Sequence, residues 1–268
     1  MCLMILLFFL IGICFGSFAN VIVDRTENGK NINGRSKCDF CGYQLKWFDN
    51  IPIVSFLILK AKCRKCRKKL SWQYPAVELF TGIVFAISAW QLGVSQFFES
   101  PLFLVSSLLL MITAFLFVLV IVWDLKYMII PNELVIAGIV VTILIFGIRF
   151  FIDPCEIFDW NCFWVSGILG AVVMTGFFWI LYAVSKGKWI GGGDVKLAVW
   201  LGLLIGLKMV YPALMIAYIV GVIVAIFLII RGKKGMKSQL PFGPFLILGA
   251  YVVVFFQDQL QDFISMFF

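Results

Sequence analysis

The sequence contains no histidine. Without histidine, the chain cannot form a Ser-His or Cys-His nucleophile arrangement, and it cannot hold a catalytic zinc ion through imidazole ligands. These classes of enzyme are therefore excluded. General acid and base catalysis in this protein would have to be carried out by carboxylates.

Charged residues are also scarce, at 13% of the 268 residues, whereas 63% are hydrophobic and the mean hydropathy is +1.05. This composition excludes an ordinary soluble domain. Apolar stretches long enough to cross about 30 Å of hydrocarbon occur at residues 3–23, 76–96, 102–123, 133–151, 163–184, 195–207, 209–230 and 242–257. The sequence predicts an all-α polytopic membrane protein with about eight transmembrane helices. The sixth stretch is short, and Lys208 separates it from the seventh, so this pair is alternatively a broken or partly re-entrant segment.

The placement of lysine and arginine predicts the orientation in the membrane. Twelve of the 22 lie between Arg25 and Lys69, and a second cluster comprises Arg231, Lys233, Lys234 and Lys237. The positive-inside rule places both groups in the cytoplasm, with both chain termini outside. The first apolar stretch lacks a preceding basic region and a small-residue cleavage site, so we expect it to be retained. Topology then explains the net charge of +8, and no nucleic-acid partner is needed.

Four of the eight cysteines form two CxxC pairs, Cys38-x2-Cys41 and Cys63-x2-Cys66, in the basic cytoplasmic loop 24–75. This spacing is typical of a structural zinc site with four cysteine ligands, and a redox dithiol is the main alternative. The loop is short and polar, so we expect a metal to supply the folding energy that apolar burial cannot. Basic residues around the second pair favour a membrane-surface patch rather than a catalytic set.

The other four cysteines have simpler interpretations. Cys155 and Cys162 lie in the predicted outer loop between the fourth and fifth stretches, where an oxidising exterior permits a disulfide. Cys2 and Cys14 lie at or in the first stretch and are interpreted as small apolar packing residues.

Two aspartates lie where apolar stretches meet the predicted cytoplasmic side. Asp124 follows the third stretch, and Asp194 follows Gly191, Gly192 and Gly193, which lack side chains and allow a bound peptide to approach the backbone. Two carboxylates that share one proton can activate water against a peptide bond. The pair therefore indicates an intramembrane aspartic protease. The alternatives are a solvated aspartate at a helix end for Asp124 and an ordinary N-cap for Asp194.

Five motifs, in order, extend the argument over nearly the whole chain: residues 16–25 (Gly16-Ser17-Phe18-Ala19-Asn20-Val21 and Arg25), the two CxxC pairs with 74–78, then 124–132, 191–197 and 241–246. Together they resemble the bacterial type IV prepilin leader peptidases, membrane aspartic proteases with a GxGD motif. The resemblance implies cleavage of the basic leader of prepilins or pseudopilins, followed by N-methylation of the new terminal residue with S-adenosylmethionine. It also implies a bacterial cytoplasmic (inner) membrane location, with the active site at the cytoplasmic face.

The resemblance implies a division of labour along the chain. Residues 1–100 would form the methyltransferase half, with two transmembrane helices and the zinc loop, and residues 101–268 the peptidase half, with six. The catalytic residues would be Asp124 and Asp194, and the structural zinc ligands Cys38, Cys41, Cys63 and Cys66. Supporting or substrate-binding residues would be Gly191, Gly192, Gly193, Lys196, Pro241, Gly243, Asn20 and Glu78. For Pro241 and Gly243 a simple turn is an equally good interpretation.

Two other classes of function compete with this one. A disulfide-forming membrane redox protein also carries paired cysteines, but its working pairs should face outward. A transporter or lipid-modifying scaffold would account for the helices and acids, yet it gives no role to the four-cysteine loop or to the glycines before Asp194.

Overall fold

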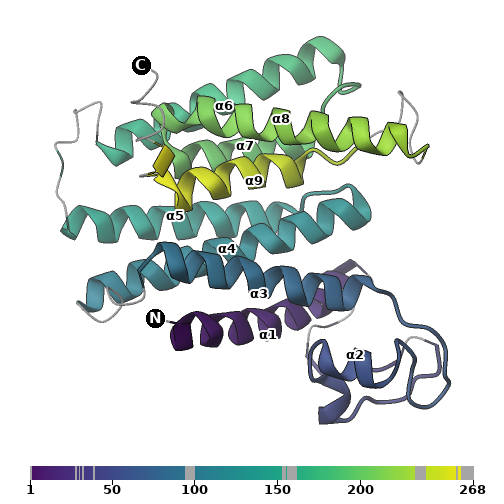
Figure 1. Ribbon diagram of the computed structural model, residues 1–268. Helices are drawn as coiled ribbons and strands as arrows, with labels where there is room; N and C mark the ends of the chain where they lie inside the picture. The colour runs from purple at the N-terminus through teal and green to yellow at the C-terminus, as the bar shows by residue number, and fades with distance from the viewer. Residues whose placement is uncertain are drawn as a thin grey trace. The chain divides into compact units, whose positions relative to one another are not determined.

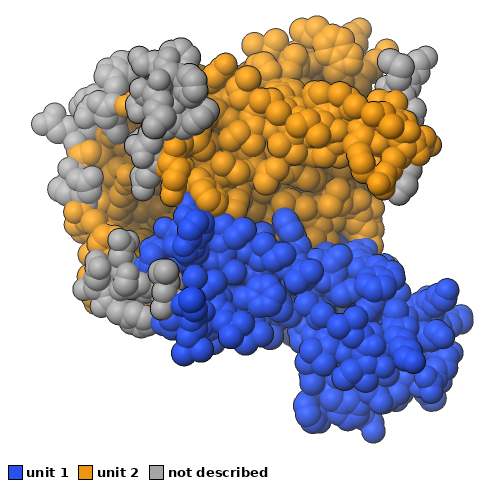
Figure 2. Space-filling view, viewed as in Figure 1, with its two compact units in different colours: residues 1–98 blue, residues 99–268 orange. Residues whose placement is uncertain are grey.

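The computed structural model describes residues 2–27, 29, 31, 33–38, 40–93, 100–152, 155, 162–232, 240–257 and 259–260. Lys233, Lys234 and Lys237 of the second cationic cluster lie outside the described residues. Over the described ranges the chain is mostly helical and has no named strand. It divides into two compact units, residues 1–98 and 99–268 (Figure 2).

Unit 1 is a pair of apolar helices with a loop between them. Helices α1 (Cys2–Glu27) and α3 (Gln73–Gln91) pack side by side, and the loop carries a short 3-10 helix, η1 (Trp47–Asn50), and a single helical turn, α2 (Val54–Ile58) (Figure 1). The helices approach closely at two glycines of α1. A Cβ on Gly12 would lie 2.8 Å from the Cβ of Phe85, and one on Gly16 would lie 2.6 Å from the Cα of Glu78. Small residues at such a crossing let helices associate through backbone packing where lipid provides no hydrophobic driving force.

Within its described residues unit 2 has six helices, of which α4 is the most buried of the long ones. The helices are α4 (Pro101–Tyr127), α5 (Asn132–Ile152), α6 (Phe163–Ser185), α7 (Gly192–Ile205), α8 (Leu207–Ile230) and α9 (Gly243–Phe255). At the start of α4, the Ser100 hydroxyl accepts a hydrogen bond from the N–H of Phe103 and Pro101 occupies the first turn. Both features are typical of a helix N-terminus. At its other end, Met128 adopts a left-handed conformation that stops the helix four residues after Asp124.

The fully buried Trp200 of α7 fixes that helix against its neighbours. Its ring lies 5.1 Å from the ring of Phe117 in α4, and its indole N–H donates to the Thr142 hydroxyl of α5 at 3.2 Å. Gly138 of α5 leaves the space that this ring occupies, because a Cβ there would clash with it. These contacts set the position of α7, and therefore of Asp194, which lies six residues earlier on the same helix.

Helix α7 is short and ends at a glycine break. Its 14 residues extend about 21 Å, which is less than the hydrocarbon thickness of about 30 Å. Gly206 has a φ of 73° and separates α7 from α8. The predicted interruption is therefore present, but it lies at Gly206, and Lys208 is part of the first turn of α8.

The fold class predicted from composition is confirmed. An apolar helix lies in each of the eight predicted stretches, and α1, α4, α5, α6 and α8 are each long and apolar enough to cross a membrane. Several helix ends differ from the predicted boundaries by three to five residues; the difference that affects the site is that α7 begins at Gly192 and not at residue 195. The glycines favoured a loop in sequence terms, since glycine is a poor helix former. In the structure Gly192 and Gly193 belong to the first turn, where fewer intrahelical bonds are made.

Candidate active site

Asp124 occupies the last turn of α4 and is almost fully buried, with 5% of its surface exposed. Its backbone carbonyl accepts the N–H of Met128 at 2.9 Å, so the end of the helix holds the residue rigidly. The side-chain Oδ2 is buried without a hydrogen-bond partner. A carboxylate oxygen left in this state is costly unless a ligand or a reaction uses it.

Asp194 lies in the first turn of α7, and Gly191 is the N-cap residue of that helix. The alternative interpretation of Asp194 as the N-cap residue is therefore wrong, because Asp194 lies three residues after the N-cap. The backbone N–H of Asp194 donates to the Gly191 carbonyl at 3.2 Å, which closes the glycine turn. The carboxylates of Asp194 and Asp124 are close enough for their charges to interact directly. The fold thus brings together two aspartates that are 70 positions apart in the sequence.

A third segment completes this site, which we call the aspartate site: Asp124, Asp194, Gly243 and Ile130. Gly243 is the first residue of α9, and a Cβ there would lie 2.6 Å from Oδ2 of Asp124. The buried Ile130 contacts both glycines, at 3.4 Å from the positions that a Cβ on Gly193 or Gly243 would take. The N-termini of α7 and α9 thus both lie beside the carboxylates. Their partial positive charges favour one ionised carboxylate while its partner keeps the proton.

Sequence reasoning missed Ile130 and Tyr218. Tyr218 of α8 lies within electrostatic range of Asp194, and its ring lies 5.1 Å from that of Phe242, the N-cap residue of α9. Ile130 lies within the 124–132 motif but has an apolar side chain that suggests no role, and Tyr218 lies in an apolar run with no motif around it. The single available signal was a tyrosine hydroxyl within an apolar stretch, which usually needs a polar partner.

Lys196 and Asn132 lie at the edge of a groove between α5 and α7. The Lys196 ammonium donates to Oδ1 of Asn132 at 2.9 Å. The groove has a volume of about 400 Å³ and is lined by Asn132, Val135, Ile136, Ile139, Lys196 and Val199. The groove therefore combines an apolar lining with one cation, Lys196, which follows Asp194 by two residues on α7.

Asn20 and Glu78 belong to unit 1, where α1 and α3 meet the loop. The Asn20 amide donates to the carbonyls of Gly16, at 3.3 Å, and Tyr74, at 3.2 Å, while its buried Oδ1 has no partner. The buried Glu78 accepts the backbone N–H of Ile53 at 2.7 Å, so it anchors the start of α2. Asn20 keeps a free acceptor, whereas Glu78 already uses one carboxylate oxygen to hold the loop.

The four loop cysteines form a candidate metal centre. Their sulfur atoms all lie within 4.8 Å of one another, and those of Cys38 and Cys66 are 3.9 Å apart. A tetrahedral zinc ion with Zn–S bonds of about 2.3 Å requires sulfurs about 3.8 Å apart. The cluster therefore fits the ion with little adjustment, and the prediction that the two pairs come together in one cluster that could hold a metal ion is confirmed.

The two CxxC segments fold as equivalent turns. In the first, the N–H of Cys38 donates to the Tyr43 carbonyl and that of Gly42 to the Cys38 carbonyl. In the second turn, the N–H of Cys63 donates to the Lys68 carbonyl, and the N–H of Arg67 donates to the Cys63 carbonyl. Backbone N–H groups of Cys66 and Lys65 lower the pKa of Cys63 to about 7, whereas burial raises the pKa of Cys38 to about 11. Metal binding at this cluster would therefore displace the proton of Cys38, and acid would oppose it.

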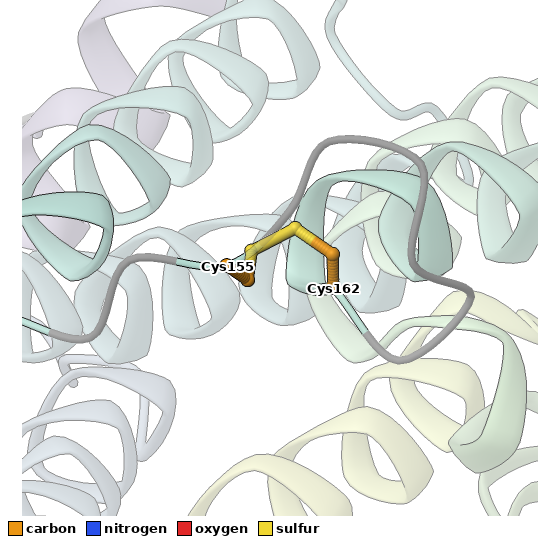
Figure 3. The surroundings of a disulfide bond; sticks show 2 residues. All are labelled: Cys155 and Cys162. Carbon is orange, nitrogen blue, oxygen red and sulfur yellow. A yellow bond between two sulfur atoms is a disulfide. The ribbon is translucent and has the colours of Figure 1, made fainter.

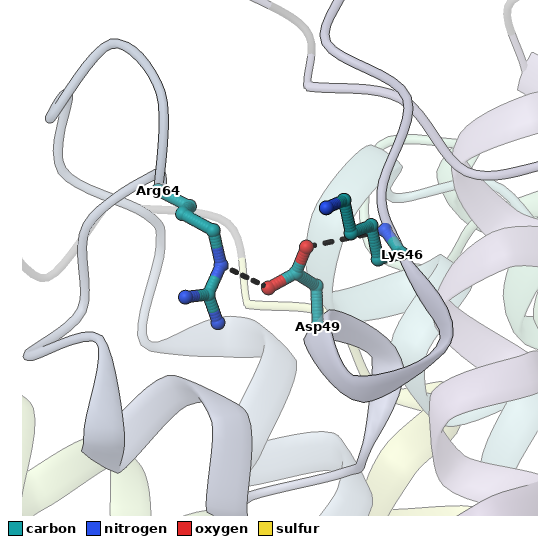
Figure 4. Close-up of polar contacts among 3 residues, drawn as sticks. All are labelled: Lys46, Asp49 and Arg64. Atoms are coloured by element: carbon teal, nitrogen blue, oxygen red, sulfur yellow. Dashed lines mark hydrogen bonds and ion pairs between the residues drawn. The ribbon is translucent and has the colours of Figure 1, made fainter.

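The loop also has polar and apolar contacts of its own. Asp49 accepts hydrogen bonds from the Arg64 side chain at 2.7 Å and from the Lys46 backbone N–H at 3.1 Å (Figure 4). Phe56 is buried, and its ring lies 5.0 Å from that of Trp72. The expectation that the loop builds no core was therefore too strict. These contacts are few, so a bound metal would still add to the folding free energy of the loop.

The remaining cysteines divide as follows. Cys155 and Cys162 form a disulfide at the junction of α5 and α6 (Figure 3), which confirms the pairing expected for an outer loop. Cys2 and Cys14 are exposed on α1, so their interpretation as packing residues was wrong. Their side chains lie on the outer surface of an apolar helix.

Comparisons with known proteins agree with this geometry. Residues 10–92 match the bacterial peptidase A24 N-terminal domain, and residues 108–226 match the type IV leader peptidase family. The prepilin leader peptidase/N-methyltransferase of Bacillus subtilis is 30% identical over 97% of this chain and 97% of its own length. The protein of the same name from Neisseria gonorrhoeae is 30% identical over 91% of this chain and 87% of its length. No solved structure matches. This chain therefore belongs to the type IV leader peptidase family.

Proposed function

We propose that this protein removes the leader peptide of type IV prepilins or pseudopilins and then N-methylates the new N-terminal residue with S-adenosylmethionine. The observation that carries the peptidase assignment is the meeting of Asp124, Asp194 and Gly243 at one buried point of unit 2. The methyltransferase assignment is supported by the names of the relatives, which cover nearly the whole chain.

In the proposed cleavage step, one aspartate of the pair takes a proton from water while the other, protonated, donates a hydrogen bond to the scissile carbonyl. Water attacks the carbonyl carbon, the tetrahedral intermediate collapses, and the leaving amine receives a proton. No covalent intermediate with the protein forms. The two roles belong to the pair, because coupled carboxylates titrate together.

The position of Asp124 at the end of a membrane helix suits a prepilin substrate. Such a substrate presents a basic leader in the cytoplasm and an apolar helix in the bilayer, so its scissile bond lies at the inner membrane boundary. We place the aspartate site at this cytoplasmic boundary on the charge distribution of the sequence.

The backbone around the site supports an extended substrate. Gly191 and Gly192 are exposed and carry no side chains to obstruct a peptide. Pro241 lacks an N–H, and Gly243 begins α9 against Asp124. The groove beside Lys196 would receive the first apolar residues after the scissile bond.

In the methyltransferase half, the unpartnered Oδ1 of Asn20 is a hydrogen-bond acceptor for the substrate amine or for the methyl donor. Glu78 acts by holding the loop through Ile53. We assign zinc to the four-cysteine cluster, where it would have a structural role, because four sulfur ligands complete its coordination.

The reaction is tested by incubating the full-length protein in proteoliposomes with a synthetic prepilin-like substrate and by measuring product masses. We expect one cut between the basic leader and the apolar segment. With the methyl donor added, the product should gain the mass of one methyl group. Intact substrate after incubation with folded protein, across several pilin sequences, would contradict the proposal and favour a transporter or scaffold.

Replacing Gly243 with alanine is expected to reduce the cleavage rate about 10²-fold, because the new methyl group would displace the Asp124 carboxylate by about an ångström. Gly221→Ala is the matched control, since a Cβ there makes ordinary contacts, 3.5 Å from Phe245. Initial cleavage rates of the two variants provide the comparison. Equal activity would show that Gly243 does not constrain Asp124.

A further inference from the structure

Exposed apolar side chains gather on the loop of unit 1, outside the predicted membrane stretches. Val54, Leu57 and Ile58 share one face of α2 because they have i, i+3, i+4 spacing. Leu57 is 61% exposed and Ile58 is 71% exposed. Trp72 is also exposed, at 68%, but it contacts the buried Phe56, which lies on another face of α2. We call Val54, Leu57 and Ile58 the loop apolar patch. A cluster of this kind on a polar loop indicates an interaction surface.

One hydrogen bond ties the segment that carries this patch to α3. The N–H of Ile53, just before α2, donates to Glu78, which lies about 7.5 Å along α3 from its first residue, Gln73. The interfacial layer of a bilayer is roughly 5–7 Å thick on each side. The hydrogen bond therefore ties the start of α2 to α3 two residues into the predicted apolar stretch 76–96, which is within the thickness of the interfacial layer from the cytoplasmic end of that stretch. Figure 1 shows α2 beside the loop end of the α1–α3 pair.

The charge of the surrounding loop indicates which kind of partner fits the loop apolar patch. Between residues 40 and 72 the chain has eight lysines and arginines and one acid, Asp49, which is already paired with Arg64. Lys60 and Lys62 directly follow α2 and are exposed. A second copy of this loop would carry the same positive charge, as would a basic leader peptide, so both would be repelled. An apolar face bordered by cations fits an anionic lipid surface.

We propose that the loop apolar patch inserts into the headgroup boundary of the cytoplasmic leaflet, with Lys60 and Lys62 bound to anionic headgroups. This contact holds the four-cysteine cluster at the membrane surface instead of leaving it free in the cytoplasm. The inserted segment is short, so its binding to the membrane surface depends on both the apolar contact and the two lysines.

The test places the photo-crosslinking residue p-benzoyl-L-phenylalanine at Ile58 of the full-length protein. The matched control carries it at Gln44, an exposed polar position on the first cysteine turn. Both proteins are reconstituted into vesicles of phosphatidylglycerol and phosphatidylethanolamine in equal parts, illuminated, and analysed by mass spectrometry. Retained substrate cleavage and zinc content establish that each labelled protein is folded.

Lipid adducts are expected at position 58 and not at position 44. Combining Lys60→Gln with Lys62→Gln should lower the adduct yield by about fivefold or more, the factor corresponding to one lysine near an anionic surface. Vesicles of phosphatidylcholine alone should give a similar decrease. The proposal would be overturned if position 58 formed adducts with residues 99–268 or with a second copy of the protein. It would also be overturned if position 58 formed lipid adducts no more often than position 44. The absence of lipid adducts in a protein that still cleaves substrate would likewise overturn it.

Discussion

Replacing Cys63 with serine is expected to remove the bound metal and abolish methylation, while leader cleavage continues. The four sulfurs lie within 4.8 Å of one another, and removing one leaves an incomplete coordination sphere. The loop has few other side-chain contacts to hold its shape, so we expect a bound metal to supply much of its folding energy. The aspartate site lies in the other compact unit, residues 99–268, and uses none of these cysteines.

The measurement is zinc content by elemental mass spectrometry, together with cleavage and methyl transfer by the same purified protein. Cys14→Ser is the matched control, because Cys14 is exposed on α1 and outside the cluster. Its zinc content and both activities should equal those of the unaltered protein. If Cys63→Ser kept its zinc, the metal assignment would fail. If the unaltered protein held no metal and instead cycled between dithiol and disulfide, the redox interpretation would replace it.

The sequence was sufficient to predict the eight apolar helices, the cysteine cluster and the disulfide. Hydropathy identifies helices in a membrane protein because every backbone group in lipid must be bonded within its own segment. The CxxC spacing is local, so Cys38 and Cys41, or Cys63 and Cys66, lie close together in any fold of the loop. The catalytic role of Asp124 and Asp194 stays a prediction, although the structure brings the two carboxylates within electrostatic range of each other.

Other features depend on packing that no local pattern records. Ile130 contacts two glycines from helices that begin 62 and 113 residues later. Tyr218 lies within electrostatic range of Asp194, a residue of α7, and its ring packs against Phe242 at the start of α9. This position depends on the packing of α8 against α9. The partner of Glu78 is a backbone N–H 25 residues away, and a backbone group has no sequence signal. The start of α7 was misplaced because glycine usually indicates a loop.

Replacing either aspartate with asparagine is expected to reduce cleavage by about 10²–10⁴-fold or more, because each variant removes one of the two groups that transfer protons. Asparagine has nearly the size of aspartate, so the buried surroundings of Asp124 should keep their packing. Glu133→Gln is the matched control, since Glu133 is an exposed acid in the first turn of α5. It should retain full activity.

The most direct measurement is the initial rate at which unaltered protein, Asp124→Asn and Asp194→Asn cut a prepilin-like substrate in proteoliposomes, with products identified by mass. An unchanged thermal unfolding transition, followed by circular dichroism, establishes that each variant is folded. Both variants are expected to methylate an already cleaved substrate normally and to cut the intact substrate at least about 10²-fold more slowly. Undiminished cleavage by either variant would remove that aspartate from the mechanism and contradict the two-carboxylate site.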